Sequence, residues 1–299
     1  MIPSPSKTLN SNPNEAWTLV NRRRRRGKPI TNAASRSKTL TPSPEHKTPS
    51  SWIPTDSSTD SERESKLLAR MESAIRELGS SRFVHRFLSR YRDPQIQKEL
   101  NKLLTPCLQI QIVAYGIGSI ESYKTPRLPL ALALLLRQEL GVRAMRPIEV
   151  FDPVLSAVEC AVLAALGCRV ITVDECGRRE TAMPTIYYMP HCEAMLYDNL
   201  LDANWKPVML RRMVVIGNSF GVYERYVKEM RGACGSVALE VDGRHLLWIR
   251  RYVREVEMEG KENGRDFKED EDEVELFKAF HDLSWHFFEL DDDADMGEL

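Results

Sequence analysis

Polar residues that could bind a small molecule follow five apolar runs of this chain, each with the length of a buried strand. The carboxyl ends of parallel strands meet at one edge of a sheet, and ligands of open α/β sheets bind there. The set therefore predicts a site for a small nucleoside-like ligand. Its members are Gly116, Gly118 and Ser119 after the first run, Asp152 after the second, Asp174 and Glu175 after the third, His191 and Glu193 after the fourth, and Asn218 and Ser219 after the fifth.

Each part of this set has a functional and a structural interpretation. Gly116-Ile117-Gly118 allows a tight turn with exposed backbone N–H groups, although it lacks the third glycine of the dinucleotide fingerprint. Asp152 stands where many nucleotide sites bind a ribose, and Asp174 with Glu175 where an adenine edge often lies. The structural alternative is that Asp152 and Asp174 cap the turns and helices that follow them. The sequence leaves both interpretations open.

Met189-Pro-His-Cys-Glu193 contains three residue types that bind metals. Consecutive residues do not converge easily on one ion, and no second cluster has ligand spacing. We therefore predict no metal site and assign no catalytic residue. The expected structural roles are a helix cap for Glu193 and a hydrogen bond within the turn for His191.

Strand-like runs alternate regularly with helix-like segments in the centre of the chain. This alternation predicts an α/β fold, a Rossmann-like three-layer sandwich with a mostly parallel sheet and helices on both faces. A hairpin or a last strand is expected near 237–249, and a final strand at the sheet edge near 285–290. The predicted core strands are 108–115, 148–152, 168–173, 185–189 and 212–217, and the helices are 127–140, 154–166, 193–202 and 219–230.

Charge and composition change sharply along the chain. Residues 1–60 carry ten Lys/Arg against four Asp/Glu and eight of the seventeen prolines, whereas residues 255–299 carry four Lys/Arg against eighteen Asp/Glu. Such segments are typical of solvated tails. The predicted organisation is a disordered basic N-terminal tail (1–60), a helical lead-in (61–104) whose first helix opens with a Ser61-x-x-Glu64 capping box, the core (105–254), an acidic flexible insertion (255–275), a terminal helix or strand of the core (276–290) and an acidic tail (291–299).

The six cysteines include no Cys-x-x-Cys pair, and no apolar run approaches the length of a membrane span. We expect a soluble intracellular protein with reduced thiols and no membrane contact. The tail contains five consecutive arginines, Arg22, Arg23, Arg24, Arg25 and Arg26. They could act in nuclear import; specific nucleic-acid binding is disfavoured because no recognisable reading module accompanies them.

The sequence motifs at the polar strand tips resemble those of the SRR (Sensitivity to Red Light Reduced) family over roughly residues 108–220. A Trp17-Thr-Leu-Val segment before the arginines and a strand-like segment at 279–288 also resemble it. The chain departs from the family pattern in its Tyr115-Gly116 turn and in the Lys124-Thr-Pro-Arg insert. The matching motifs are Tyr115-Gly-Ile-Gly-Ser119, Phe151-Asp-Pro-Val154 with Glu159, Met189-Pro-His-Cys-Glu193, Leu196-Tyr-Asp-Asn-Leu-Leu201 followed by Asn204-Trp205, and Val215-Ile-Gly-Asn-Ser-Phe220.

The resemblance implies a regulatory role in circadian rhythm or light signalling in plants, and in haem-biosynthesis and clock-gene regulation in animals. It implies cytoplasmic and nuclear localisation and protein partners that the sequence does not identify, and it carries over no catalytic residue and no cofactor. The function then rests on protein interaction or on a small-ligand pocket at the strand tips. The alternative is an enzyme, either methyltransferase-like and dependent on S-adenosylmethionine or another nucleotide-binding type. Haem binding through His191 or Cys192 is disfavoured, because no Cys-Pro pair is present.

Overall fold

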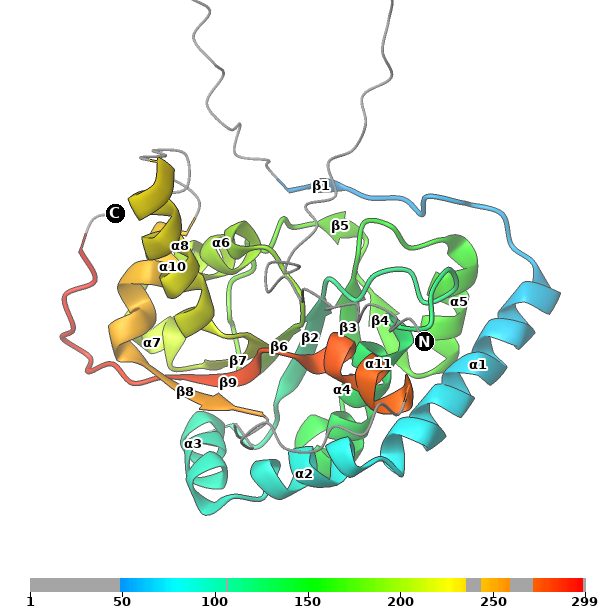
Figure 1. Cartoon of the computed structure of the whole chain (residues 1–299), viewed down its shortest axis with the longest axis horizontal. Helices are drawn as coiled ribbons and strands as arrows, with labels where there is room; N and C mark the ends of the chain where they lie inside the picture. The colour runs from blue at the N-terminus through cyan, green and yellow to red at the C-terminus, as the bar shows by residue number, and fades with distance from the viewer. Residues whose placement is uncertain (1–48, 106, 235–242, 259–270, 298–299) are drawn as a thin grey trace, which may run out of the picture. The chain divides into compact units, whose positions relative to one another are not determined.

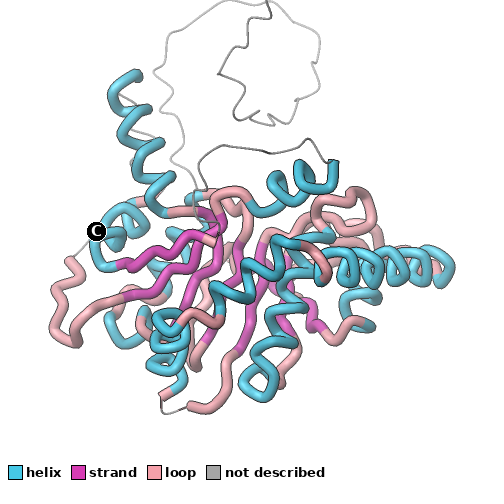
Figure 2. The backbone as a smooth tube through the Cα atoms, turned by 60° about the horizontal axis from the view of Figure 1, so that its bottom comes forward, coloured by secondary structure: helices cyan, strands magenta, loops and turns pink. Residues whose placement is uncertain are grey.

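A computed structural model describes residues 49–105, 107–234, 243–258 and 271–297. Its centre is a seven-stranded sheet (Figure 1; strands magenta in Figure 2). The first five of these strands in chain order are parallel to one another. The last two join the sheet through antiparallel pairing. The spatial order is β4 (Cys168–Val170), β3 (Ile148–Phe151), β2 (Gln111–Tyr115), β6 (Thr185–Met189), β7 (Met213–Asn218), β9 (Leu283–Phe288) and β8 (Val253–Glu257).

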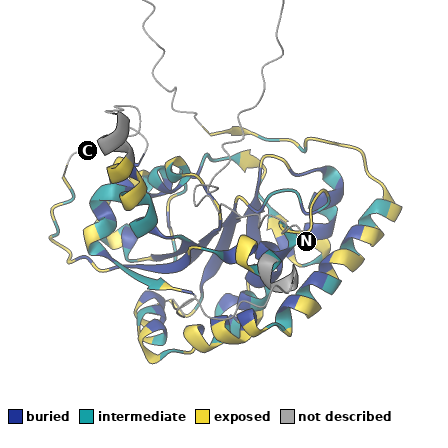
Figure 3. Ribbon diagram, in the orientation of Figure 1, coloured by how far each residue is buried: buried dark blue, intermediate teal, exposed yellow. Residues whose placement is uncertain are grey.

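Both faces of the sheet are buried, which explains why its central strands are continuous apolar runs. In β2, Ile112 and Ala114 pack into one hydrophobic cluster, while Val113 and Tyr115 pack into the other. Successive side chains of a strand point to opposite faces, so one strand contributes to two cores. Figure 3 shows the resulting buried strands between helices whose outer sides are exposed. The predicted α/β class, the mostly parallel sheet and the helices on both faces are confirmed.

The helices of the first face bring distant parts of the chain together, since α4 and α5 both pack against α1. The N-cap of α1 is Asp60, whose carboxylate accepts the N–H groups of Glu62 and Arg63. The predicted capping box at Ser61 is therefore wrong, because the N-cap is Asp60 and the residue three positions later is Arg63, although the helix itself is present. The helices that contribute to this core are α1 (Ser61–Gly79), α2 (Arg82–Tyr91), α3 (Pro94–Leu104), α4 (Arg127–Leu140), α5 (Ala157–Ala165) and α11 (Glu271–Phe280).

The second face is covered by helices from the C-terminal half of the chain. Tyr197 is fully buried here, and its hydroxyl donates to the Met189 carbonyl at the end of β6. None of the helices in the described ranges has the length and apolarity needed to span a bilayer. The elements of this face are α6 (Ala194–Ala203), α7 (Pro207–Leu210), α8 (Phe220–Cys234), α10 (Arg244–Ile249) and the short 3₁₀ turn η2 (Arg250–Tyr252) that follows it. A second 3₁₀ turn, η1 (Gly141–Ala144), follows α4 and contributes Ala144 to the first core.

The C-terminal region differs most from the sequence predictions. The segment 244–249, predicted as part of a hairpin or last strand, is the helix α10, and 235–242 lies outside the described residues. Residues 255–257, assigned to the acidic insertion, belong to strand β8. The final strand β9 is not at the sheet edge, because it pairs with β7 on one side and β8 on the other.

The N-terminal segment also forms structure where a tail was predicted. Strand β1 (Ser50–Ser51) pairs antiparallel with β5 (Val173–Asp174), a two-residue strand split from the predicted strand 168–173. The following residues continue along the carboxyl ends of β3 and β4: the Trp52 N–H donates to the Thr172 carbonyl at 3.0 Å. Residues 50–56 are called the N-terminal strap below. The Arg22–Arg26 run lies outside the described residues.

Candidate functional site

The predicted site residues lie along the carboxyl edge of the sheet, as the parallel strands require. Strand β2 leads to β3 on one side, and the later strand β6 joins β2 on the other side. The order of the sheet therefore reverses between β2 and β6, and ligands of open α/β sheets bind at such a switch point. The Gly116–Gly118 turn and the turn that contains His191 both begin there.

The Gly116–Gly118 turn is held by Asp152 from the neighbouring strand. The Oδ2 atom of Asp152 accepts the Gly118 N–H at 2.8 Å, and its Oδ1 atom accepts the Val154 N–H at 3.0 Å. Burial raises the pKa of the Asp152 carboxyl, while these two backbone hydrogen bonds act in the opposite direction. The two glycines have φ angles of 68° and 73°, a region that favours glycine. Asp152 thus performs the capping role that the structural interpretation assigned to it.

Glu159 was named only as part of a family motif, yet it organises the same edge. It is almost completely buried, and its Oε1 atom accepts the Ser119 hydroxyl at 2.7 Å and the Glu121 N–H at 3.0 Å. Its Oε2 atom accepts the Ser156 N–H at 2.7 Å and completes a capping box at the start of α5. The Ser156-x-x-Glu159 spacing is a sequence signal that could have identified it.

Asp174 and Glu175 belong to two separate arrangements. The Oδ1 atom of Asp174 accepts the Cys176 N–H at 2.9 Å, as in an Asx turn. The Oε2 atom of Glu175 accepts the hydroxyl of Tyr115, whose pKa is raised by burial and by this carboxylate. Arg179 pairs with Glu175 at 3.3 Å and also with the buried Glu149. Glu175 is therefore one end of a charged network beneath the edge.

His191 and Asn218 connect the ends of β6 and β7. The His191 N–H donates to Asn218 Oδ1 at 2.7 Å. The ring Nε2 of His191 lies 2.8 Å from the Ala279 carbonyl, which accepts only, so Nε2 carries the proton and Nδ1 is the acceptor in the neutral ring. Burial of the ring lowers the His191 pKa. The Tyr223 hydroxyl accepts a hydrogen bond from the Asn218 side-chain amide at 3.2 Å and donates one to the Cys192 carbonyl.

Glu193 and Ser219 stand at the starts of the next helices. Glu193 has the extended backbone of an N-cap, but its side chain makes no capping hydrogen bond, which corrects the predicted role. Its exposed carboxylate has no hydrogen-bond partner among the described residues. Ser219 does cap its helix: its Oγ accepts the Val222 N–H at 3.1 Å. Its own N–H donates to the Asp282 carbonyl at 2.8 Å.

Backbone strain collects at this same edge. In the described ranges, the non-glycine residues with positive φ are Cys176 at 51°, His191 at 56° and Asp282 at 60°. They follow β5, follow β6 and precede β9, so all three stand at the carboxyl edge of the parallel strands. Such residues cost about 1–3 kcal/mol each and occur preferentially at functional sites.

The N-terminal strap covers part of the edge. The Trp52 Nε1–H donates to the Pro153 carbonyl at 3.3 Å, and its ring meets Phe151 edge-on with 5.4 Å between centroids. The Thr55 N–H and the Asp56 carbonyl bond the backbone of Leu155 and Ala157 at 2.9 and 2.7 Å. The strap thus occupies the end of β3, beside the position predicted to bind a ribose.

No group of three or more His, Cys, Asp and Glu side chains in the part of the chain that the structure describes is placed to hold a metal ion. Two cavities there have volumes of about 290 and 560 Å³, and neither is lined by a predicted site residue. Both lie near the amino ends of the strands. The predicted site is a set of hydrogen-bonded turns, and the nucleoside-like ligand stays a prediction.

Comparison with known proteins gives a consistent result. The model of the family described as SRR1 domain matches residues 96–287. The Arabidopsis thaliana protein named SENSITIVITY TO RED LIGHT REDUCED 1 is 37% identical over 246 residues, which is 82% of each chain. The mouse and Drosophila melanogaster proteins named SRR1-like are 40% identical over 125 residues and 28% over 138 residues, covering 50% and 41% of those chains. No solved structure matches.

Proposed function

This chain belongs to the SRR1 domain family, and from that premise we propose that it is a regulatory protein of the response to red light. The observation that carries the proposal is the 37% identity across 82% of both this chain and the Arabidopsis protein, whose name refers to reduced sensitivity to red light. A role in circadian timing is a more specific version of the same proposal and rests on the family resemblance. Regulation of haem biosynthesis rests on the family resemblance alone, because the mouse relative aligns over only 41% of this chain.

The carboxyl edge of the sheet is the surface through which we propose that the protein acts. Three strained non-glycine residues stand there, and hydrogen bonds fix the turns between the strands. Within the described residues, the Nδ1 atom of His191 and the exposed carboxylate of Glu193 retain hydrogen-bonding capacity. A rigid edge that presents a neutral imidazole and a carboxylate suits recognition of a nucleoside-like molecule or of a partner's polar groups.

Complementation tests this proposal directly. The chain is expressed in Arabidopsis plants that lack the relative, and the response of seedlings to red light is measured. We expect restored sensitivity with the wild-type chain and a loss with His191→Ala combined with Glu193→Ala. A matched control changes His85 on α2 and Glu77 at the C-terminal end of α1, both exposed, whereas the N-terminal end of α1 is the one that contacts the carboxyl edge through Arg63 and Glu121. Failure of the wild-type chain to restore the response would contradict the regulatory role.

An enzyme that uses S-adenosylmethionine is the second candidate, and one observation supports it. The order β4-β3-β2-β6-β7-β9-β8, with β9 reversed, is also typical of the sheet in Rossmann-like methyltransferases. In this alternative, the cofactor binds at the switch point beside the Gly116–Gly118 turn. Titration calorimetry with S-adenosylmethionine tests it. Saturable binding that disappears in Gly118→Val, with the fold retained, would favour the enzyme; heat of dilution alone at about 1 mM ligand would exclude it.

We also propose that the protein is present in the cytoplasm and the nucleus, as the family resemblance implies. The support from the chain is the run Arg22–Arg26, whose density of positive charge is that of an import signal.

A further inference from the structure

We propose that the amino edge of the sheet, opposite the edge discussed above, binds an acidic amphipathic helix of a partner protein. This inference goes beyond the proposed function, because it involves none of the residues assigned to the carboxyl edge. The surface in question, here called the amino-edge surface, consists of the residues that line the two cavities. They are Asn101, Leu104, Thr105, Leu108, Gln109, Val142 and Arg143 around one, and Leu134, Arg137, Gln138, Gly141, Ala144 and Met145 around the other.

The two cavities adjoin each other across η1. Val142 and Arg143 of this turn line the larger one, of about 560 Å³, while Gly141 and Ala144 line the smaller one, of about 290 Å³. The turn is fixed to the sheet, because the Ile110 N–H donates to the Arg143 carbonyl at 2.7 Å just before β2. The turn between the two cavities is therefore tied to the start of the sheet, and a fixed turn lowers the entropic cost of binding a helix beside it.

Large apolar side chains are unusually exposed on this surface. Leu108 is 84% exposed, Val142 is 81% exposed, and Met145, which follows η1, is 65% exposed. Leu108 and Val142 line the same cavity although 34 positions separate them in the chain, so tertiary structure brings them together. Apolar side chains gathered in a concave region are characteristic of interaction sites, whereas single exposed ones need no explanation.

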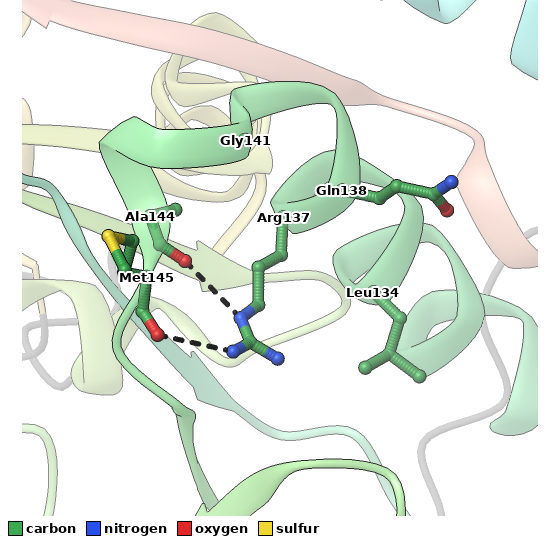
Figure 4. Close-up of a pocket in the computed structure, with 6 residues that line it drawn as sticks. All are labelled: Leu134, Arg137, Gln138, Gly141, Ala144 and Met145. Atoms are coloured by element: carbon green, nitrogen blue, oxygen red, sulfur yellow. Dashed lines mark hydrogen bonds between the residues drawn. The ribbon is translucent and has the colours of Figure 1, made fainter.

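The charge around the groove identifies the kind of partner. Arg137 donates to the carbonyls of Ala144 and Met145, both at 3.3 Å, as Figure 4 shows. Arg143 donates to the Gln97 amide oxygen at 3.3 Å. Arg146 lines neither cavity, but it is exposed next to Met145 and makes no ion pair within the described residues. None of these three guanidinium groups is therefore neutralised by a carboxylate of the described chain.

The carboxylates on the neighbouring helices do not change this balance, because they already have cationic partners. Glu99 on α3 pairs with Lys102 at 2.9 Å and with Arg254 at 3.4 Å. Glu139 on α4 pairs with Arg92 at 2.9 Å. A surface with exposed apolar side chains and an excess of arginine is complementary to a helix with apolar residues on one face and Asp or Glu beside them.

Fluorescence anisotropy with the full chain tests the proposal. The probe is a labelled peptide of about 18 residues, five helical turns, with Leu at i, i+3, i+4 and i+7 and Glu elsewhere. The comparison peptide carries Lys in place of every Glu. We expect saturable binding of the acidic peptide and at least about tenfold weaker binding of the basic one. Equal affinity for both peptides, or none for the acidic one, overturns the proposal.

Paired variants locate the binding site. Leu108→Ser with Val142→Ser should weaken the acidic peptide about tenfold, and Arg143→Glu with Arg146→Glu should weaken it by a similar factor. The controls are Ile53→Ser, an apolar residue 79% exposed on the strap, and Arg225→Glu, exposed on α8. Equal losses in the controls overturn the assignment. A concentration-dependent dimer in sedimentation, abolished by the Leu108/Val142 pair, would instead identify a second copy as the occupant and also overturn it.

Discussion

Individual side chains at the carboxyl edge mainly hold the turns that follow the strands. Asp152 provides both of its oxygens to backbone N–H groups, and Glu159 accepts three hydrogen bonds. Buried polar groups are costly when they lose their partners, so these carboxylates fix the shape of the edge whether or not a ligand binds there. His191 and Glu193 differ from them, because the Nδ1 atom of His191 and the carboxylate of Glu193 have no hydrogen-bond partner among the described residues.

Replacement of Asp152 by alanine should destabilise the fold. Two backbone N–H groups lose their acceptor, and we expect the free energy of unfolding to fall by about 1–3 kcal/mol. Urea denaturation of the purified chain measures it. Asp174→Ala, which removes a single hydrogen bond within one turn, is the matched control and should cost less. An unchanged unfolding midpoint for Asp152→Ala would show that the carboxylate does not support the turn.

His286 should make stability depend on pH. It is fully buried, and burial lowers its pKa to about 4; Glu255 of β8 acts to raise it and Arg250 of η2 to lower it. In the unfolded chain His286 therefore binds a proton as the pH falls below about 6.5, whereas in the folded chain it stays neutral until about pH 4. The contribution of the neutral His286 to the free energy of unfolding should be fully present above about pH 6.5. It should be lost as the pH drops toward 4, by an amount on the order of 2–3 kcal/mol.

The measurement is the urea midpoint between pH 7.5 and pH 4.5. His286→Gln keeps a donor for the Val215 carbonyl and an acceptor for the Phe220 N–H, but it does not titrate. The decline in stability should become shallower in this variant and remain unchanged in His85→Gln, whose histidine is exposed. An identical pH profile for His286→Gln and the wild-type chain would refute this role.

Elements that are distant in sequence complete the structure at the level of strands and helices. Strand β9 lies between β7 and β8 and carries the fully buried Trp285, so the last strand of the chain is internal to the sheet. The N-terminal strap lies across the ends of β3 and β4 through β1 and Trp52. Strands from the middle of the chain are therefore contacted by the strap, which precedes them in the sequence, and by β8 and β9, which follow them.

Trp52 should anchor the strap. Trp52→Ala removes the edge-on contact with Phe151 and the hydrogen bond to the Pro153 carbonyl, and because the residue is half-buried we expect a loss of about 2 kcal/mol. Thermal unfolding followed by circular dichroism measures the loss. Ile53→Ala, at the adjacent and 79% exposed position, should change stability by less than about 0.5 kcal/mol. Equal effects of the two substitutions would contradict the anchoring role.

The whole molecule has two candidate surfaces at opposite edges of one sheet. The carboxyl edge presents fixed polar turns and strained residues, and the amino edge presents exposed apolar side chains with unneutralised arginines. The formal net charge of −1 conceals strongly opposed ends, with a basic first sixty residues and an acidic C-terminal segment. Electrostatic effects of these two charged segments can therefore be measured only with a chain that contains both of them.

Import into the nucleus should depend on the arginine run. Replacing Arg22–Arg26 by alanine in a fluorescent fusion of the full chain should lower the nuclear share of the signal severalfold, because import signals are recognised by their positive charge. Quantitative microscopy measures the ratio of nuclear to cytoplasmic fluorescence. Alanine at the five other basic positions of 1–60 serves as the control; these are Lys7, Lys28, Arg36, Lys38 and Lys47. An unchanged ratio for the arginine variant would refute the prediction.

The sequence by itself determined the parallel half of the sheet and the family. Buried strands are apolar runs and amphipathic helices have a 3.6-residue period, so the strands β2, β3, β6 and β7 and the helices between them could be located from local patterns. The common edge of the polar tips followed from parallel pairing. The motifs from Tyr115 to Phe220 indicated the family that the comparisons then showed.

Only the tertiary structure decided what those polar residues contact and where the strap and the strands β8 and β9 lie. Local pattern cannot show that Asp152 bonds Gly118, that Glu193 leaves its helix uncapped, or that Leu108 and Val142 share a cavity, since each involves chain folding in three dimensions. The same holds for α10, predicted as strand because Leu246–Ile249 is a short apolar run, and for β9, whose inner position depends on β8 pairing with it. Short apolar runs fit either structure, and non-local pairing chooses between them.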